Sequence, residues 1–308
     1  MWERLAGEPE LRCTAAGECV FLAERRCALH AAGGADAKPS LCRRYPFDLI
    51  ATPLGDRVVT AHRCPCRSMG ERAPLTAEDA ARALGDAAGR LSPSREAPAR
   101  VPLTARTTVS FASWAVLEGP LIARLSAGAP ASDALGVAPR LPALRGASWR
   151  DVAGSFCAYG EHAFRGYQAL AWFGDGILLA GGERTAARPR GWAAGFDHAE
   201  ARSAAPAEPA RVLGDWLADL VWDLSWMENG PVDLARASIG ALAVVATAVT
   251  ERMIELGLRS DRAAAEAVMV AEIAAAHPRW AEVVARMEPA PGGYRADNTA
   301  GRSDNRGG

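Results

Sequence analysis

The sequence predicts a mainly α-helical fold, in which a loop-rich cysteine module at the N-terminus packs on an Ala-rich helical domain. Three observations lead to this prediction. Six of the seven cysteines lie in the first 66 residues, helical periodicity dominates the middle of the chain, and the end of the chain has almost no apolar side chains. We therefore divide the chain into a cysteine module (1–72), a helical domain (75–288) and a disordered tail (289–308).

Helical spacing recurs throughout residues 75–288. Thr76 followed by Asp79 resembles a capping box, and Leu213, Leu217 and Leu220 recur at intervals of four and three. Pro120 is expected to kink or split the helix around it. Further helices are expected at 109–128, 148–173, 232–257 and 261–287, and a long loop at 182–210.

Composition and charge restrict the class of protein. The chain is 49% hydrophobic and 23% charged, as globular proteins are, and its formal net charge is −1. Such a small charge argues against nonspecific binding to nucleic acid or anionic membranes. The first residues lack the apolar core of a secretory signal, and the most apolar run, 239–249, is shorter than the roughly 20 residues that span a membrane. We therefore expect a cytoplasmic protein with no nucleic-acid and no membrane partner.

The clustered cysteines indicate a metal site. In a cytoplasmic chain, such a cluster binds metal or performs redox chemistry more often than it forms disulfides. A segment with little core of its own also needs a metal or crosslinks for stability. No pair has the CxxC spacing of zinc ribbons or ferredoxin loops, so buried packing thiols and disulfides stay open as alternatives. The candidate ligands are Cys13, Cys19, Cys27, Cys42, Cys64 and Cys66.

The neighbours of these cysteines suit a thiolate cluster. Arginines flank Cys27 and Cys42 and would offset the negative charge of metal-bound thiolates or donate hydrogen bonds to sulfur. Two histidines in the segment are alternative ligands or donors. The residues concerned are Arg25, Arg26, Arg43, Arg44, His30 and His62.

The stretch 19–46 resembles the YkgJ-type cysteine-cluster family, also called the zinc- or iron-chelating family. The shared pattern is C-x-F-L, then C-x-I-H, then G-x-x-x-K-P-x-x-C-R-x-Y-P, and the family has a later cysteine that Cys64 or Cys66 matches. The cysteine-dense run that the family usually carries upstream is not in this sequence. The matching residues are Cys19, Phe21, Leu22, Cys27, Leu29, His30, Gly34, Lys38, Pro39, Cys42, Arg43, Tyr45 and Pro46.

This resemblance implies a function, because the family includes flagellin lysine N-methylases. It implies an iron–sulfur cluster as first choice and zinc as second, S-adenosylmethionine as methyl donor, and a protein substrate that bears lysine. No residue could be assigned as base or as part of a cofactor pocket. The alternative is a noncatalytic protein-interaction module that zinc merely staples.

Other candidate sites give weaker signals. Asp215, Asp219 and Asp223 recur every four residues on one predicted helix. Stacked carboxylates can build a metal site in a helical bundle, but a solvated face is favoured here, and such a face could attract a lysine-bearing substrate. The stretch 174–184 could be a strand and a turn that approaches a phosphate or nucleotide, but an ordinary turn is favoured because the spacing is not G-x-G-x-x-G. Glu161 and His162 fit a core or surface role. Cys157 fits a buried packing residue.

Overall fold

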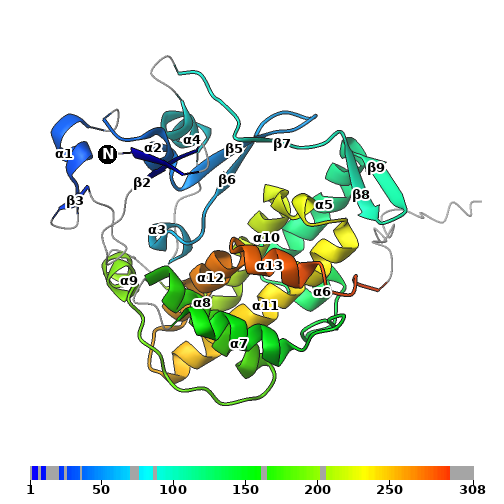
Figure 1. Cartoon of the computed structure of the whole chain (residues 1–308). Coiled ribbons are helices and arrows are strands. Elements are labelled where there is room, and N and C mark those ends of the chain that lie inside the picture. The colour runs from blue at the N-terminus through cyan, green and yellow to red at the C-terminus, as the bar shows by residue number, and fades with distance from the viewer. Residues whose placement is uncertain are drawn as a thin grey trace, which may run out of the picture.

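Figure 1 shows the computed structural model, which describes residues 2–5, 8–11, 21–23, 26–34, 37–69, 76–85, 89–160, 165–201 and 206–291. Cys13, Cys19, Glu161 and His162 lie outside these residues, as does most of the predicted tail; of Cys66 only the backbone is described. The described chain is mainly helical, which confirms the predicted fold class at that level.

Short strands and helices make up the chain as far as residue 96 and occupy the upper left of Figure 1. β1 pairs with β2, and β3 with β4, both antiparallel. The elements are β1 (Trp2–Leu5), β2 (Glu8–Leu11), β3 (Leu22–Ala23), β4 (Arg26–Cys27), α1 (Ala28–Gly33), α2 (Ser40–Arg44), β5 (Phe47–Ala51), β6 (Arg57–Thr60), α3 (Pro65–Ser68), α4 (Ala77–Leu84) and β7 (Arg95–Glu96).

β5 is the central strand of a three-stranded sheet. β6 pairs with it antiparallel, with Phe47 opposite Thr60, and β7 pairs with it parallel, with Ile50 opposite Arg95. Successive side chains of a strand point to opposite faces. Accordingly, Leu49 packs in a small cluster with α4, whereas Ile50 belongs to the main hydrophobic core. The sheet therefore lies between α4 and the helical part of the molecule.

Helices follow from residue 111 onward, after a short hairpin of β8 and β9. α7 packs along α8, and α12 contacts α8, α10 and α11. The elements are β8 (Arg100–Thr104), β9 (Thr107–Ser110), α5 (Phe111–Ser126), α6 (Ala131–Leu135), α7 (Trp149–Tyr159), α8 (Arg165–Ala180), α9 (Ala193–Glu200), α10 (Pro209–Asp223), the 3-10 helix η1 (Ser225–Glu228), α11 (Val232–Glu255), α12 (Ser260–Ala275) and α13 (Pro278–Val284).

Small residues let the central helices approach closely. Residues 261–271 of α12 are all buried, and most of them are Ala or Val. A helix that is apolar on every side lies inside a core. In α10, a Cβ atom on Gly214 would lie 2.2 Å from the carbonyl oxygen of Leu125, so the backbone of α10 rests directly on the end of α5.

Three local expectations were wrong. The stretch 174–184 is not a strand, because α8 continues through it to Ala180. The predicted loop at 182–210 contains α9. Of the two effects expected of Pro120, the split does not occur, since α5 runs through this residue. The helix predicted at 261–287 is divided at His277, whose ring nitrogen accepts the backbone N–H of Arg279 and caps α13.

One helix in the described chain, α11, is long and apolar enough to cross a membrane by length and composition. Its most apolar 18-residue window has a mean hydropathy of 1.7, and 72% of that window is buried inside the protein. Core helices of soluble proteins pass the same test. The cytoplasmic location stays a prediction.

Candidate functional site

A pocket of about 470 Å³ lies where the N-terminal sheet meets α10 and α12. One wall comes from residues 44–48, 59–63 and 94–95, the other from the two helices. Its volume falls within the roughly 300–1,000 Å³ of small-molecule sites. The apolar lining is Pro46, Phe47, Val59, Ala61, Trp216, Leu220 and Ala276, and the polar lining is Arg44, Tyr45, Asp48, Thr60, His62, Arg63, Ser94, Arg95, Asp219, Asp223 and Glu272.

Asp219 of α10 joins this helix to the N-terminal segment. Its Oδ2 atom accepts hydrogen bonds from Thr60 Oγ1 at 3.1 Å, His62 Nε2 at 2.7 Å and Arg67 Nη2 at 2.9 Å. Burial alone would raise the pKa of this carboxyl, but the hydrogen bond from His62 and the charges of His62 and Arg67 outweigh it. The pKa of Asp219 is therefore lowered, and the group is ionised at neutral pH.

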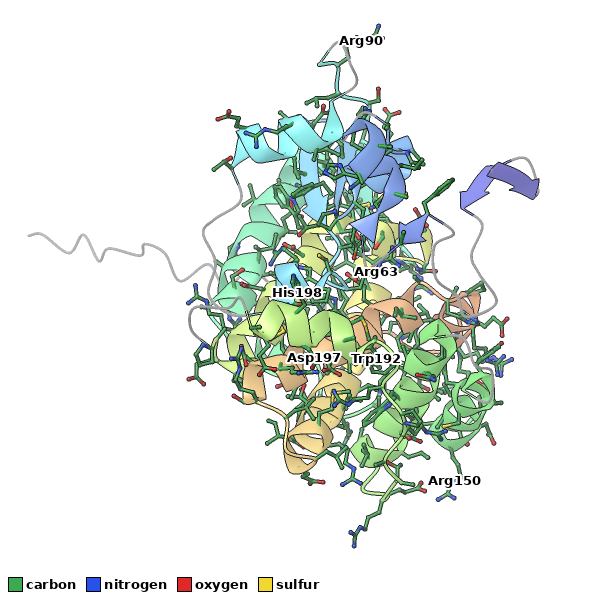
Figure 2. All side chains as sticks on the ribbon, turned by 90° about the vertical axis from the view of Figure 1, so that its left-hand side faces the viewer. Arg63, Arg90, Arg150, Trp192, Asp197 and His198 are labelled. Carbon is green, nitrogen blue, oxygen red and sulfur yellow. The ribbon has the colours of Figure 1, made fainter. Side chains whose placement is uncertain are left out.

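Glu272 of α12 holds the same segment through its backbone. Glu272 Oε1 accepts the N–H of His62 at 3.0 Å, and Oε2 accepts the N–H of Arg63 at 2.6 Å. The turn that leads into α3 is thus fixed by two carboxylates of the helical domain. Figure 2 shows Arg63 at the boundary between the N-terminal elements and the helices, and its side chain is exposed.

Arg57 anchors β6 deeper in the core. Its guanidinium forms a buried ion pair with Glu118 of α5, donates to the Trp222 carbonyl at 3.3 Å, and lies 4.0 Å from the ring centroid of Trp222. Trp222 Nε1 in turn donates to the Val58 carbonyl at 3.0 Å. The β6 strand is therefore held firmly against α5 and α10.

Tyr45 makes the direct connection between the pocket and the cysteines. Its hydroxyl forms a hydrogen bond with Cys64, which directly precedes α3. Tyr45 is 44% exposed overall, but partial burial of its hydroxyl and the charge on Cys64 raise its pKa above the usual value. The phenol therefore keeps its proton and donates it toward sulfur, a type of contact that stabilises thiolate ligands.

The described cysteines are spread over three elements. Cys27 directly precedes α1, Cys42 lies in α2, and Cys64 precedes α3; all three side chains are half-buried. Within the part of the chain that the structure describes, no three His, Cys, Asp or Glu side chains form a group that could hold a metal ion. The described residues alone therefore do not make up a complete ligand set.

The basic and histidine neighbours have other contacts. Arg44 forms an ion pair with Asp48 at 2.8 Å, so its charge is already offset by a carboxylate. His62 is 1% exposed and is hydrogen-bonded to Asp219, so it fits a positioning role better than metal ligation. His30 is exposed in α1, and the side chains of Arg25 and Arg26 lie outside the description.

The sequence suggested that the three aspartates of α10 form a solvated face, and this prediction was wrong. Asp219 contacts the N-terminal segment, and Asp223 forms an ion pair with Arg95 of β7. Asp215 does not line the pocket. The spacing of four was thus correctly recognised, but its meaning was missed, because the partners lie more than a hundred residues upstream.

A buried carboxylate on α12 was also missed. Glu266 is fully buried and accepts hydrogen bonds from Arg190 at 2.7 Å, Trp192 at 2.8 Å and Arg262 at 2.8 Å. These contacts fasten α9 to α12, and α9 also packs on α3. Figure 2 shows Trp192 close to Asp197 and His198 of α9. The signal in the sequence was a glutamate in an otherwise apolar run of α12, which indicates a buried, paired charge.

Cys157 lies in α7, away from the N-terminal elements. It is half-buried rather than fully buried, and its sulfur lies 3.5 Å from Asp175 Oδ1. Burial and the charge of Asp175 raise the pKa of its thiol to about 11. A protonated thiol in such a place is unreactive.

Comparisons with known proteins add no relative, since no family model, curated protein or solved structure matches this chain significantly. The resemblance of residues 19–46 to the YkgJ-type family stays a prediction.

Proposed function

We propose that this protein binds a metal centre through the cysteines of its first 66 residues, an iron–sulfur cluster as first choice and zinc as second. The observation that supports this most is the position of Cys64. Its thiol accepts a hydrogen bond from Tyr45 at the edge of a pocket, on a turn that Asp219 and Glu272 hold in place. Fixed thiols with hydrogen-bond donors are suited to metal ligation.

The proposed ligands are Cys19, Cys27 and Cys42, with Cys64 or Cys66 as the fourth and Cys13 as the remaining candidate. Three of these cysteines, Cys27, Cys42 and Cys64, have described side chains, and all three are half-buried. A four-thiolate set binds either zinc or an iron–sulfur cluster. Ligands from separate elements also suit a metal that contributes folding free energy to a segment with little core.

The second part of the proposal is protein-lysine N-methylation with S-adenosylmethionine, which rests on the resemblance to the YkgJ-type family. The cofactor would supply a methyl group on a sulfonium, and the protein would have to align a lysine amine with it. We assign both ligands to the pocket beside Cys64, because it combines adequate volume, aromatic walls and carboxylates.

The alternative is a noncatalytic module in which zinc staples the N-terminal segment for protein binding. The contacts of Arg57, Asp219 and Glu272 favour this alternative, because they already fix residues 57–67 on the helical domain. A metal bound to this segment could then act purely structurally.

Anaerobic purification, followed by iron, sulfide and zinc analysis, separates these readings. Iron and sulfide in equal amounts, with absorbance near 400 nm, support the cluster, whereas stoichiometric zinc in colourless protein supports the staple. Absence of both metals after reconstitution contradicts the proposal. Calorimetry of the metal-loaded protein with S-adenosylmethionine then tests methylation, and no heat at millimolar cofactor rules it out.

A further inference from the structure

We infer that a second pocket, where the 3-10 helix η1 meets α11 and α13, binds a small uncharged molecule through the side chains of Ser238 and Trp280. We call it the tryptophan pocket, because the indoles of Trp226 and Trp280 both line it. Leu220 of α10 borders this pocket and the larger one described above, so the two lie on opposite sides of the same side chain. The inference rests on neither the proposed metal nor the proposed methylation.

The lining of the tryptophan pocket is uncharged. Among the described residues, no Asp, Glu, Lys, Arg or His side chain lines it, whereas carboxylates and arginines line the larger pocket. A buried charge needs a partner of opposite charge, and without one it costs far more than a buried neutral group. The tryptophan pocket therefore favours an uncharged ligand.

Two polar groups in this lining are buried and lack a partner. Ser238 of α11 is 8% exposed and Trp280 of α13 is 3% exposed, and no described residue forms a hydrogen bond with Ser238 Oγ or Trp280 Nε1. The unpaired polar atoms that the protein seals from solvent belong to other residues, so these two atoms reach open space. The tryptophan pocket is the open space that both side chains border. Because buried polar groups are normally hydrogen-bonded, these two groups point to a ligand.

The two indoles have different parts in this site. Trp226 Nε1 donates to the Val221 carbonyl at 3.2 Å, and its ring packs edge-on against Trp114 at 5.3 Å, so Trp226 supplies an apolar wall. The ring of Trp280 packs edge-on against Phe173 at 5.5 Å, and its N–H is unpaired. Trp280 therefore presents a donor on a ring that is already held in place, which lowers the entropic cost of binding an acceptor.

The backbone is strained where the chain reaches this pocket. Leu224 has a φ of 62°, in the left-handed region, which is unfavourable for a bulky side chain. This residue ends α10 and begins η1, and the turn brings Ser225 and Trp226 into the pocket wall. Strain of this kind recurs at ligand sites. It accompanies the two unpaired groups and does not by itself indicate a ligand.

The volume restricts the size of the ligand. The tryptophan pocket measures about 70 Å³, which is room for roughly five groups the size of a water molecule. Its apolar lining, which includes Leu234, Ile239 and Val284, suits one or two carbon groups. The polar end of the ligand has to accept from Trp280 Nε1 and to donate to or accept from the Ser238 hydroxyl. A short-chain amide meets all these requirements.

Two sources can supply an uncharged amide, a free small molecule or a glutamine side chain of a partner protein. Comparison of propionamide with N-acetyl-glutamine methylamide distinguishes the two sources. Equal or tighter binding of the glutamine derivative indicates a side chain, and much weaker binding indicates a free molecule.

The test uses three probes of one shape, propionamide, propionate and propionamidinium, which are neutral, anionic and cationic at neutral pH. Ligand-observed NMR on the full chain measures their affinities. Propionamide is expected to bind at least about tenfold more tightly than either ion, because the pocket offers no partner for a charge. The indole N–H signal of Trp280, which Trp280→Phe identifies by its loss, should shift when propionamide binds.

Variants then test the lining. Ser238→Ala removes the unpaired hydroxyl and should weaken propionamide binding about fivefold. Thr250→Val is the matched control, because it removes a buried hydroxyl of α11 that lies outside the pocket and bonds the Ala246 carbonyl. Ala275→Leu narrows the pocket while every polar group stays in place, and it should also weaken binding.

The comparison of the three probes uses the wild-type protein, so it remains decisive if a variant fails to fold. The inference is wrong if propionamide does not bind or if an ion binds as tightly as propionamide. It is also wrong if Ser238→Ala weakens binding no more than Thr250→Val does, or if Ala275→Leu has no effect. Neither metal nor S-adenosylmethionine enters these measurements, so their outcome is independent of the proposed function.

Discussion

Arg57 and Glu118 form an ion pair in which both side chains are buried, 61 residues apart in sequence. The pair joins β6 of the N-terminal sheet to α5 of the helical part, and the rings of Phe111 and Trp222 flank the guanidinium. It is therefore a main point of attachment between the two parts.

Breaking this pair should destabilise the protein strongly. Glu118→Ala leaves the Arg57 guanidinium buried without its partner, which costs about 3–5 kcal/mol. Urea unfolding at pH 7 measures the change, with Glu255→Ala as control, because the Glu255 side chain that pairs with Arg252 is 65% exposed. The double variant Arg57→Met/Glu118→Leu should lose much less. Equal losses in Glu118→Ala and Glu255→Ala would contradict the burial argument.

The cysteine variants should separate ligands from bystanders. Single Cys→Ser changes at Cys19, Cys27 and Cys42 are each expected to lower bound metal and the melting temperature, because metal binding contributes folding free energy. Metal analysis and thermal unfolding after anaerobic reconstitution provide the measurement. If all three variants keep full metal content and the wild-type melting temperature, the ligand assignment is wrong.

Cys157 should behave as a protonated, nonligating thiol. Cys157→Ala is expected to keep the metal content and to cost on the order of 1 kcal/mol in packing. Metal loss in this variant would show that the helical domain donates a ligand.

The raised pKa of Cys157, about 11 against an ordinary 9.0, predicts a distinct effect of pH. Its alkylation should be slow at pH 8 and accelerate toward pH 11. Between these two pKa values the unfolded chain releases this proton while the folded chain retains it, so stability should fall as pH rises through that window. An alkylation rate at pH 8 that matches a free thiol would refute this.

Asp219 should contribute stability that is lost in acid. Its folded pKa is lowered below the ordinary 3.8, so its contribution is present above that value and disappears as pH falls through the folded pKa. Asp219→Asn should therefore be less stable than wild type at pH 7, with the difference shrinking below about pH 4. Denaturant unfolding at a series of pH values measures it, with Asp215→Asn as control. If the difference in stability between Asp219→Asn and wild type does not change with pH, the charge of Asp219 does not contribute to stability.

The helical character was predictable because it depends on local periodicity. The leucine spacing of α10 and the long apolar run of α11 both appear as helices. Gly174 and Gly176 misled the prediction for α8, since they indicated a turn. In the structure they permit close helix contacts: a Cβ on Gly174 would lie 2.6 Å from Cys157 Sγ, and one on Gly176 would lie 2.5 Å from Val249.

The pocket could not be predicted, because its parts are far apart in the sequence. Asp219 meets Thr60 and His62 across more than 150 residues, and Glu272 meets His62 across 210. A single sequence shows that these side chains are charged, but not which charges meet. Tyr45 was part of the recognised motif, yet its hydrogen bond to Cys64 follows only from the path of β5 and β6.

The contacts of Glu272 with His62 and Arg63 have a consequence for how the protein is made. A ribosome adds about 5–20 residues per second. The 210 residues between His62 and Glu272 therefore represent roughly 10–40 s of synthesis. During that interval the turn that carries Cys64 has been made, but the helix that holds it has not. Until α12 has been made, the backbone of that turn lacks the two hydrogen bonds that Glu272 accepts from it.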